Sequence, residues 1–375
     1  MIQLENVTKK FSNGLTAVDE VSLNINEGEF VVFIGPSGCG KTTTMKMINR
    51  LIEPTQGKIM VNGIDISKQD PIQLRRGIGY VIQEIGLMPH MTVAENIALI
   101  PKLQKWPKDK QQRRVEELLD MVGLKVDETI NKYPRQLSGG QRQRVGVARA
   151  LAVDPPVMLM DEPFGALDPI TREQLQDEFI RLQQKVKKTI VFVTHDMDEA
   201  IKFADRLVIL DKGKIVQCDS PQNILRNPAN SFVRDFVGTD HALRQLSLIK
   251  IEDVMITNIN KLKPYDSIGE AKRLFVKGYR SIVIVDDNEK VLGYINKDDA
   301  EKQQDQQKIS EIMISNVETI KHDKCLKEAL NHMLRYDFGS LIVVDGSSRL
   351  LGIITPNCLY KNVGEGYVEE ENRGA

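Results

Sequence analysis

Residues 35–42 read Gly35-Pro36-Ser37-Gly38-Cys39-Gly40-Lys41-Thr42 and match the phosphate-binding pattern G-x-x-x-x-G-K-[ST] at every position. An apolar run at 30–34 predicts a buried strand before this loop, and apolar residues at helical spacing predict a helix after it. The glycines let backbone N–H groups turn toward phosphate oxygens, and the helix N-terminus adds positive partial charge. The stretch therefore predicts a nucleotide phosphate site, with Lys41 on the β- and γ-phosphates and the Thr42 hydroxyl on Mg²⁺.

The bulk composition narrows the class of protein. A length of 375 residues allows two or three domains, and 41% apolar with 27% charged residues is ordinary for a globular chain. The charge is nearly balanced, with 51 Lys and Arg against 52 Asp and Glu, so no nucleic-acid partner is expected. The four cysteines lie far apart, which predicts reduced thiols and no metal or disulfide framework.

The N-terminus and the hydropathy pattern bear on the membrane. Met1 leads directly into a polar, strand-like segment, so we expect no signal peptide. No run reaches the roughly 18 apolar residues that a spanning helix needs, so any role at a membrane is expected to act through partners.

A second glycine-containing loop, Leu137-Ser138-Gly139-Gly140-Gln141, precedes a basic helix at 142–151. Ser138 is a natural helix N-cap, and two glycines at a helix N-terminus form a second anion-binding nest. Two such nests suggest that one phosphate is held from two sides. A flexible loop followed by a solvated basic helix face is the alternative for this segment alone.

Polar side chains follow three predicted strands. The run Val157 to Met160 is apolar and ends in Asp161-Glu162, where Asp161 can hold Mg²⁺ through water and Glu162 can orient or deprotonate an attacking water. A predicted strand at 77–83 ends in Gln83-Glu84, and one at 189–194 ends in His195-Asp196. Because carboxyl ends of parallel strands meet at one sheet edge, these side chains are expected near the phosphates.

Residues 1–238 resemble the ATPase subunit of ATP-binding-cassette (ABC) transporters. Leu137 to Gln141 matches the signature LSGGQ without substitution, and the phosphate loop, Gln83, Asp161-Glu162 and His195 match further motifs in the expected order. The resemblance implies an α/β P-loop NTPase cassette with a RecA-like core, an antiparallel β subdomain and a helical subdomain. Apolar residues at helical spacing place that helical subdomain at 92–134.

The resemblance also implies site roles. Cassettes act as head-to-tail dimers in which ATP lies between one copy's phosphate loop and the other copy's signature, and Asp168 contacts the second copy. Glu162 is implied as general base and His195 as γ-phosphate sensor, while Gln83 links the nucleotide to the membrane subunits. The implied Mg²⁺ contacts are Thr42, Gln83 and Asp161. The implied ATP contacts are Phe11, Gly35, Ser37, Gly38, Cys39, Gly40, Lys41, Thr42, Thr43, Ser138, Gly139, Gly140 and Gln141. On the residue alone, Phe11 fits turn packing and base stacking equally well.

Beyond residue 240 the chain repeats itself at a spacing of about 59 residues. Asp253-Val254-Met255 matches Glu311-Ile312-Met313, 281–286 matches 340–345, and 292–295 matches 351–354. Each copy predicts a helix, two strands and a closing helix, and each is too small for a good core alone, so the copies should pack as a pair.

This pair resembles a tandem cystathionine-β-synthase-type (CBS) module, which implies an α/β fold and adenosine nucleotides bound between the repeats. The implied ribose contacts are Asp298 and Asn357. Asn296 stands where many relatives have Thr or Ser, whereas Thr355 keeps the pattern. The implied nucleotide contacts are Ile259, Ser281, Asp298, Ile354, Thr355 and Asn357. A pair that is purely structural is the alternative.

Cassette plus CBS pair resembles the ATPase subunits of importers for glycine betaine, carnitine, choline or proline-type osmoprotectants. That implies transmembrane permease subunits, an extracytoplasmic binding protein, a peripheral place on the cytoplasmic membrane face, and regulation by ionic strength or cyclic di-AMP. A non-transport ABC protein is the rival, but such proteins usually carry two cassettes or a coiled-coil insertion. The expected organisation is a cassette at 1–238, a linker at 239–250, CBS repeats at 251–308 and 309–362, and a disordered acidic tail at 363–375.

Overall fold

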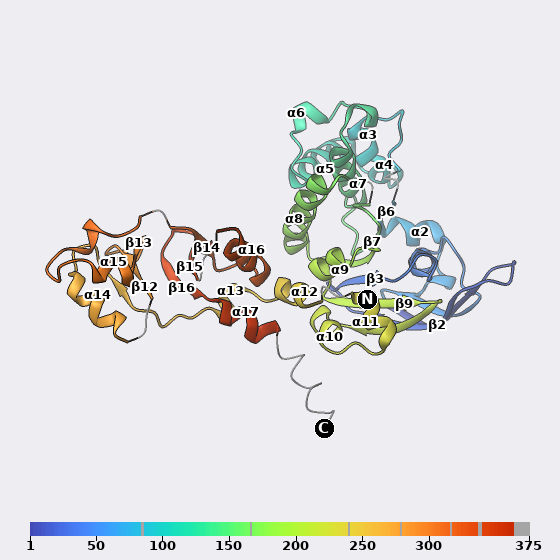
Figure 1. Ribbon diagram of the computed structural model, residues 1–375. Helices are drawn as coiled ribbons and strands as arrows, with labels where there is room; N and C mark the ends of the chain where they lie inside the picture. Colours follow the sequence, from blue (N-terminus) through green and yellow to red (C-terminus); the bar gives the residue numbers. More distant parts are fainter. Residues whose placement is uncertain are drawn as a thin grey trace, which may run out of the picture. The chain divides into compact units, whose positions relative to one another are not determined.

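The computed structural model describes residues 1–83, 86–165, 167–238, 241–277, 280–315, 317–336 and 340–363. The chain forms two compact units, Met1–Gly238 and Thr239–Ala375 (Figure 1). Glu84 and the tail from 364 onward, both named in the sequence predictions, lie outside the described residues.

A six-stranded sheet forms the core of the N-terminal unit. Its strands, in their order across the sheet, are β10 (Lys214–Asp219), β9 (Arg206–Asp211), β3 (Phe30–Ile34), β8 (Thr189–Val193), β7 (Val157–Asp161) and β6 (Ile78–Val81). Strands β9, β3, β8, β7 and β6 run parallel, and every residue of β3, β7 and β8 is buried. Such continuous apolar runs are typical of a sheet covered on both faces, and they place the carboxyl ends of these strands at one edge.

Helices of the same unit cover this sheet (Figure 1). They are α1 (Lys41–Ile48), α2 (Pro71–Arg76), α8 (Pro169–Val186), α9 (Met197–Phe203), α10 (Pro221–Arg226) and α11 (Ser231–Val237). Strands β9 and β10 form an antiparallel hairpin, and its turn residues Lys212 and Gly213 both have positive φ, as the tight turn requires.

A second, antiparallel sheet has the strand order β2 (Thr16–Ile25), β1 (Ile2–Lys10), β4 (Gln56–Val61) and β5 (Ile64–Asp65), followed by the short helix η1 (Ile66–Lys68). Its buried residues share one apolar cluster with α1 and the core sheet. The antiparallel β subdomain is therefore fused to the core rather than being a separate domain.

Residues 93–150 form the helical subdomain, drawn above the core in Figure 1. It contains α3 (Val93–Ile97), α4 (Leu99–Leu103), α5 (Lys108–Met121), α6 (Val126–Thr129), η2 (Pro134–Gln136) and α7 (Gly139–Ala150). Thr92 and Glu95 form a capping box at the start of α3. Helix α7, which follows the signature, packs against α5 and also against β6 and α8 of the core.

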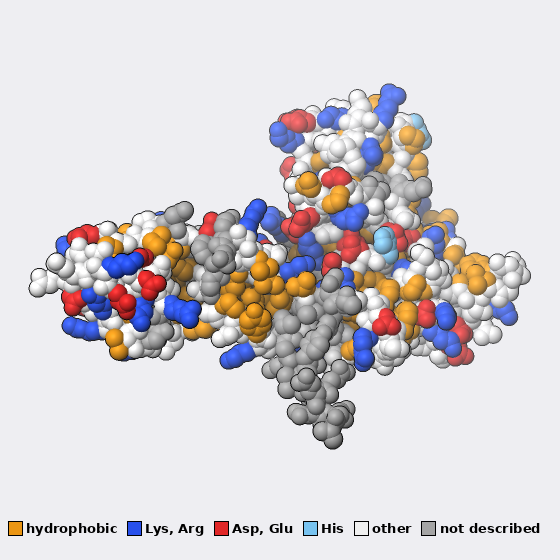
Figure 2. Space-filling model, in the orientation of Figure 1, with side chains coloured by type: hydrophobic (Ala, Val, Ile, Leu, Met, Phe, Trp, Pro, Cys, Tyr) orange, Lys and Arg blue, Asp and Glu red, His pale blue; other side chains and the backbone are white. Residues whose placement is uncertain are grey.

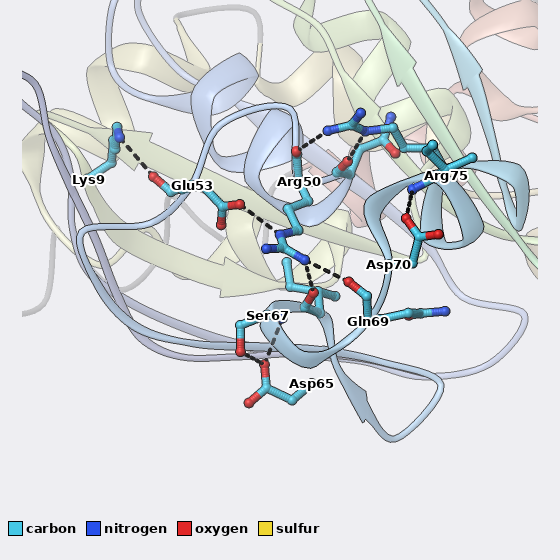
Figure 3. Close-up of polar contacts among 11 residues, drawn as sticks. Lys9, Arg50, Glu53, Asp65, Ser67, Gln69, Asp70 and Arg75 are labelled. Atoms are coloured by element: carbon cyan, nitrogen blue, oxygen red, sulfur yellow. Dashed lines mark hydrogen bonds and ion pairs between the residues drawn. The ribbon is translucent and has the colours of Figure 1, made fainter.

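Polar contacts hold the C-terminal end of α1, the helix behind the phosphate loop (Figure 3). Arg50 binds the Glu53 carboxylate at 2.7 Å and donates to the carbonyls of Ile66 and Gln69 at 2.9 and 2.7 Å. Arg75 donates to the Arg50 carbonyl at 2.6 Å. Arg75 thus satisfies a carbonyl just beyond the end of α1, and Arg50 connects that end to the η1 segment of the β subdomain.

One strand differs from its predicted length. The sequence predicts a strand over 77–83, but β6 ends at Val81, so Gln83 lies in a turn beyond the sheet. Strand β6 is at the sheet edge and pairs only with β7, and the last paired residues are Val81 and Met160. Gln83 therefore lies outside the backbone pairing of β6 with β7.

The C-terminal unit contains two three-stranded sheets of the same design, β11-β12-β13 and β14-β15-β16. The first repeat contains α13 (Ile251–Val254), β11 (Lys261–Leu262), α14 (Ile268–Phe275), β12 (Ser281–Val285), β13 (Val291–Asn296) and α15 (Lys297–Glu301). The second contains η3 (Ile309–Glu311), β14 (Thr319–Lys321), α16 (Leu326–Tyr336), β15 (Leu341–Val344), β16 (Leu350–Ile354) and α17 (Pro356–Val363). The predicted helix, two strands and closing helix are confirmed, and the short parallel strands β11 and β14 were not predicted.

The repeats exchange their first segments. Val254 and Met255, which precede the first sheet, pack against the core of the second repeat, whereas Ile312 and Met313 pack against the core of the first. The predicted packing as a pair therefore has a concrete form, in which neither repeat completes its core without residues from the other.

Residues 239–250 differ from the expected linker. Within them α12 (His241–Leu248) packs against α16 and α17, and Leu246, 2% exposed, belongs to the core of the second repeat. The apolar residues of this short segment are spaced as on one face of a helix, which is why it folds onto the domain that follows.

Candidate functional site

The phosphate loop lies between β3 and α1, as its motif predicts. Lys41 is 7% exposed, and its Nζ donates to the carbonyl oxygens of Gly35 and Pro36 at 2.6 and 2.9 Å. The ammonium group is thus already inside the loop, where an incoming phosphate would replace carbonyl oxygens as its partner. This arrangement fits a site for phosphate oxygens.

Gly40, the N-cap of α1, is a position that only glycine fits. Its φ is 106°, and a Cβ built there would lie 2.4 Å from the carbonyl oxygen of Ala17. The loop therefore approaches the backbone of the β subdomain so closely that no side chain can be accommodated.

Thr42 and Asp161 meet at the mouth of the loop. The Thr42 hydroxyl donates to Asp161 Oδ1 at 2.9 Å, and Asp161 is 6% exposed. Burial raises the pKa of Asp161, and the hydrogen bond from Thr42 acts in the opposite direction. A hydroxyl and a carboxylate are hard oxygen donors of the kind Mg²⁺ prefers, so these two residues fit a Mg²⁺ that also binds nucleotide phosphates.

Glu162 lies at the centre of three converging strand ends. Gln83 Nε2 donates to Glu162 Oε2 at 3.0 Å, and His195 Nδ1 lies 3.2 Å from the same oxygen. The side chain of Glu162 is 21% exposed and that of His195 is 64% exposed. The structure therefore brings together all three residues that the sequence places in catalysis.

The backbone fixes this carboxylate. Glu162 has a φ of 43°, in the left-handed region that non-glycine residues seldom adopt. Its N–H donates to the Val193 carbonyl at 2.9 Å, and its own carbonyl accepts from Gly165 at 3.2 Å. Strand β8 and the turn from Glu162 to Gly165 thus hold Glu162 in a strained backbone conformation. Such strain is concentrated at functional sites.

Glu199 is a residue that the sequence analysis missed. It is 5% exposed on α9 and accepts from the Thr194 hydroxyl at 2.6 Å and from Gln176 Nε2 at 3.0 Å. Burial raises its pKa, although both hydrogen bonds oppose the shift. Thr194 precedes His195, and Gln176 lies on α8, so Glu199 joins the helix after Asp168 to the strand end that carries His195. The sequence signal that could have revealed Glu199 is a carboxylate among the apolar residues of α9.

The signature loop is ordered by its own contacts. Ser138 caps α7, accepting from the Gln141 N–H at 3.2 Å, and the Gln141 side chain accepts from the Ser138 N–H at 3.0 Å. A Cβ on Gly140 would lie 2.8 Å from Thr171 Cγ2 of α8, so glycine allows close packing of the two helices. The phosphate loop is followed by a different helix, α1, which packs against β2, β4 and β8. The role of the signature in ATP binding by a second copy stays a prediction.

Two other predicted contacts have defined positions. Phe11 is 37% exposed, with Lys9 Nζ 5.3 Å from the ring centroid, so the ring is accessible rather than part of the core. Asp168 caps α8 by accepting from the Thr171 N–H at 3.1 Å, and this hydrogen bond holds the pKa of Asp168 below its usual range. Both geometries leave the predicted roles open.

A cavity of about 470 Å³ lies between the two repeats of the C-terminal unit. Its lining follows the repeat: Ser281 and Ser340 occupy equivalent positions, as do Asn296 and Thr355. Of the predicted contacts, Ile259, Ser281 and Thr355 line it. Asp298 and Asn357 are not among its lining residues, and Ile354 is fully buried in the core of the second repeat. Side chains face alternate sides of a strand, so Ile353 lines the cavity and Ile354 does not. The other lining residues are Asn260, Arg280, Val283, Tyr294, Val317, Glu318 and Ile342.

Among the described residues, no helix combines the length and apolar character that crossing a membrane requires. Nor does any group of three His, Cys, Asp or Glu side chains there form a metal cluster.

Comparison with known proteins covers both units. The ABC transporter family model matches residues 18–165, and the CBS domain model matches 251–302 and 309–364. The carnitine transport ATP-binding protein OpuCA of Listeria monocytogenes is 50% identical over 358 residues, which is 95% of this chain and 90% of the relative. The choline transport ATP-binding protein OpuBA of Bacillus subtilis is 47% identical over 377 residues, which is 100% of this chain and 99% of the relative.

A solved structure supports the fold of the N-terminal unit. The dimeric bacterial ABC transporter cassette MJ0796 matches with a TM-score of 0.54 at 40% identity, covering 59% of this chain and 99% of that one. The predicted cassette fold and CBS pair are confirmed. The chain carries a C-terminal pair of CBS domains and is similar over most of its length to the ATP-binding proteins OpuCA and OpuBA. It therefore belongs to the ABC transporter family as an ABC-type ATPase.

Proposed function

We propose that this ATPase drives the import of quaternary-ammonium osmoprotectants such as glycine betaine, carnitine, choline or proline betaine. The observation that carries the proposal is similarity over nearly the whole chain to carnitine and choline transport ATP-binding proteins, with the CBS pair included. A third relative, which matches 100% of this chain and 99% of its own length, is named for transport of glycine betaine, carnitine and choline together. These solutes share a quaternary ammonium group, so the transported class follows from what the names have in common.

Hydrolysis is assigned to the residues around Glu162. Lys41 and the loop N–H groups bind the β- and γ-phosphates. Thr42 and Asp161 would hold a Mg²⁺ ion, which would neutralise phosphate charge. Glu162 accepts a proton from a water as that water attacks the γ-phosphorus. The bond from the γ-phosphorus to the bridging oxygen then breaks, giving ADP and phosphate. Gln83 and His195, both within 3.2 Å of Glu162 Oε2, keep the carboxylate oriented.

The active assembly is a head-to-tail homodimer on the cytoplasmic face of the membrane. The solved cassette MJ0796 is dimeric, which supports this arrangement, and the exposed Phe11 is then free to stack on adenine. Transmembrane permease subunits contact residues 86–100 after Gln83, and an extracytoplasmic binding protein delivers the solute to them. Asp168, the N-cap of α8, contacts the second copy.

The CBS pair is proposed to bind a regulatory adenine nucleotide, with cyclic di-AMP as the candidate. The cavity supports this in its chemistry: Arg280 offers a cation for phosphate, Tyr294 a ring for stacking, and Ser281 with Ser340 paired hydroxyls. Its lining of repeat-related residues suits a ligand with two similar halves.

A dimerisation scaffold is the second candidate for the CBS pair. Figure 2 shows hydrophobic side chains gathered on the second repeat, and Leu334 of α16 and Tyr360 of α17 are 74% and 71% exposed. Exposed apolar groups of this size favour contact with a second copy. Calorimetry with cyclic di-AMP, ATP and AMP separates the candidates when it is done on the full-length Lys41→Ala variant, in which binding at the cassette is removed. A CBS pair that is only a scaffold then binds none of the three nucleotides.

The import proposal has its own test. In cells lacking this chain, the wild-type chain supplied in trans should restore uptake of at least one of radiolabelled choline, carnitine and glycine betaine at high osmolarity. Lys41→Ala should fail to restore it at equal abundance. Unchanged uptake of all of these solutes in the cells that lack the chain would exclude the proposed solute class.

A further inference from the structure

A cavity of about 240 Å³ lies between the helical subdomain and the core, and its lining includes none of the residues assigned to the two sites described above. Its walls come from the end of α5, from α7, from Phe164 after β7 and from α8. The apolar wall residues Val147, Phe164, Leu175, Phe179 and Leu182 are each no more than 8% exposed. Buried apolar side chains thus form part of the lining, which comes from four separate segments of the chain.

One polar group in this wall has no partner. Gln143 of α7 is 2% exposed, and its Nε2 is buried without a hydrogen bond to any described residue. A buried N–H donor without an acceptor costs about 1–3 kcal/mol. Such a group in the wall of a cavity indicates that an acceptor belongs inside it.

The rim of the cavity is charged but balanced. Arg144 binds both carboxylate oxygens of Glu178, at 2.8 and 2.7 Å, and so bridges α7 to α8. Asp120 and Arg181 complete the rim with one charge of each sign. Two acids against two bases give no net attraction for a charged ligand.

From these observations we propose that this cavity is a binding site for an uncharged single-ring aromatic molecule that carries a carbonyl acceptor and no donor. An apolar cavity of about 150 Å³ holds a benzene molecule, so the larger volume here admits a ring with a short substituent. The rings of Phe164 and Phe179 pack against the ligand ring, and the Gln143 amide donates to the carbonyl oxygen. The site is independent of the solute class and of the CBS ligand proposed above.

Occupancy of this site regulates the ATPase. Helix α7 begins at Gly139 in the signature loop, and α8 begins at Pro169 directly after Asp168. A ligand wedged between these helices limits their sliding past one another, which is a common form of conformational change. ATP turnover is therefore slower when the cavity is filled.

The test uses acetophenone and its isostere α-methylstyrene, in which a methylene group replaces the carbonyl oxygen. Ligand-observed NMR on the full-length chain should show acetophenone binding about fivefold more tightly, as one buried hydrogen bond provides. Gln143→Leu should abolish or reverse this preference. Equal affinity of the wild type for both ligands, or no binding of either, would overturn the proposal and leave Gln143 bonded to water only.

Variants whose larger side chains fill the cavity provide a second test of the proposal. Val147→Phe should abolish binding, and because added volume in a packed wall can prevent folding, Met121→Phe at the rim is the milder partner. Leu103→Phe on the exposed face of α4, where Leu103 is 52% exposed, is the control and should bind like the wild type. Saturating acetophenone should slow ATP turnover in the wild type and in Leu103→Phe but not in Met121→Phe. Binding without any change in turnover would overturn the regulatory role.

Discussion

Gln83 and Glu162 are 79 residues apart in the chain, yet Gln83 Nε2 donates a hydrogen bond of 3.0 Å to Glu162 Oε2. The contact forms because β6 ends at Val81 and releases Gln83 from the sheet edge, directly beside the end of β7. A residue that the family resemblance links to the membrane subunits thus touches the general base proposed for hydrolysis. A shift of the loop that carries Gln83 would therefore change the hydrogen bonding of the Glu162 carboxylate.

Gln83→Ala removes the donor that orients Glu162. We expect kcat for ATP to fall about tenfold with little change in KM, because misorientation affects the reacting geometry rather than nucleotide binding. Steady-state ATPase assays on the full chain measure this. Gln73→Ala, on an exposed position of α2, is the matched control and should leave kcat unchanged. A Gln83→Ala enzyme with wild-type kcat would show that the contact has no part in turnover.

Glu199 gives a prediction for pH. Burial raises its folded-state pKa above the ordinary 4.5, so ionising this carboxylate disfavours the folded state. The cost is absent below pH 4.5 and grows as the pH rises through the folded-state pKa. Glu199→Gln cannot ionise, so its melting temperature relative to the wild type should increase from pH 4.5 toward neutrality. Glu173→Gln, on the exposed side of α8, controls for the loss of one charge. A melting difference that is constant across this range would contradict the buried charge.

Two glycines of the phosphate loop form a matched pair. Both have positive φ, but only Gly40 has backbone within 3 Å of an added Cβ, whereas nothing lies within 4 Å at Gly38. Gly38→Ala should cost about 1 kcal/mol for backbone strain alone. Gly40→Ala should cost roughly 1–3 kcal/mol more, because the backbone of Ala17 must move. Thermal unfolding of the full chain checks the order, and equal melting temperatures would show that the close contact at Gly40 carries no cost.

The sequence predicted which residues converge at the end of the core sheet better than it predicted the lining of the CBS cavity, for a physical reason. Asp161, Glu162 and His195 end buried parallel strands, and parallel strands bring their carboxyl ends to one edge whatever the details of packing. The lining of the CBS cavity depends on which side of a strand faces the neighbouring repeat, so Ile354 was assigned to it when Ile353 lines it. Residues 239–250 were expected to be a linker because their apolar face spans only the short helix α12, which is stabilised by tertiary contacts through Leu246. The exchange of first segments between repeats has no local signature either.

Arg280 tests the nucleotide proposal for the CBS cavity. Arg280→Ala removes the guanidinium that would pair with phosphate, and we expect about tenfold weaker binding of cyclic di-AMP. Lys297→Ala, at an exposed position outside the lining of the cavity, removes a cation of the same charge and should bind like the wild type. Calorimetry on the full chain provides both affinities. Equal affinity in all three proteins would place the nucleotide somewhere else.

Glu162→Gln tests the central claim most directly, because the amide keeps the size of the side chain but cannot accept the proton from water. In single-turnover assays with radiolabelled ATP, the full-length variant should bind ATP at wild-type affinity. Its cleavage rate should fall by about 10²–10⁴, the range typical of a lost general base. ATP should therefore remain uncleaved in the protein. A variant that cleaves ATP at near the wild-type rate would contradict the assignment of Glu162 as the base.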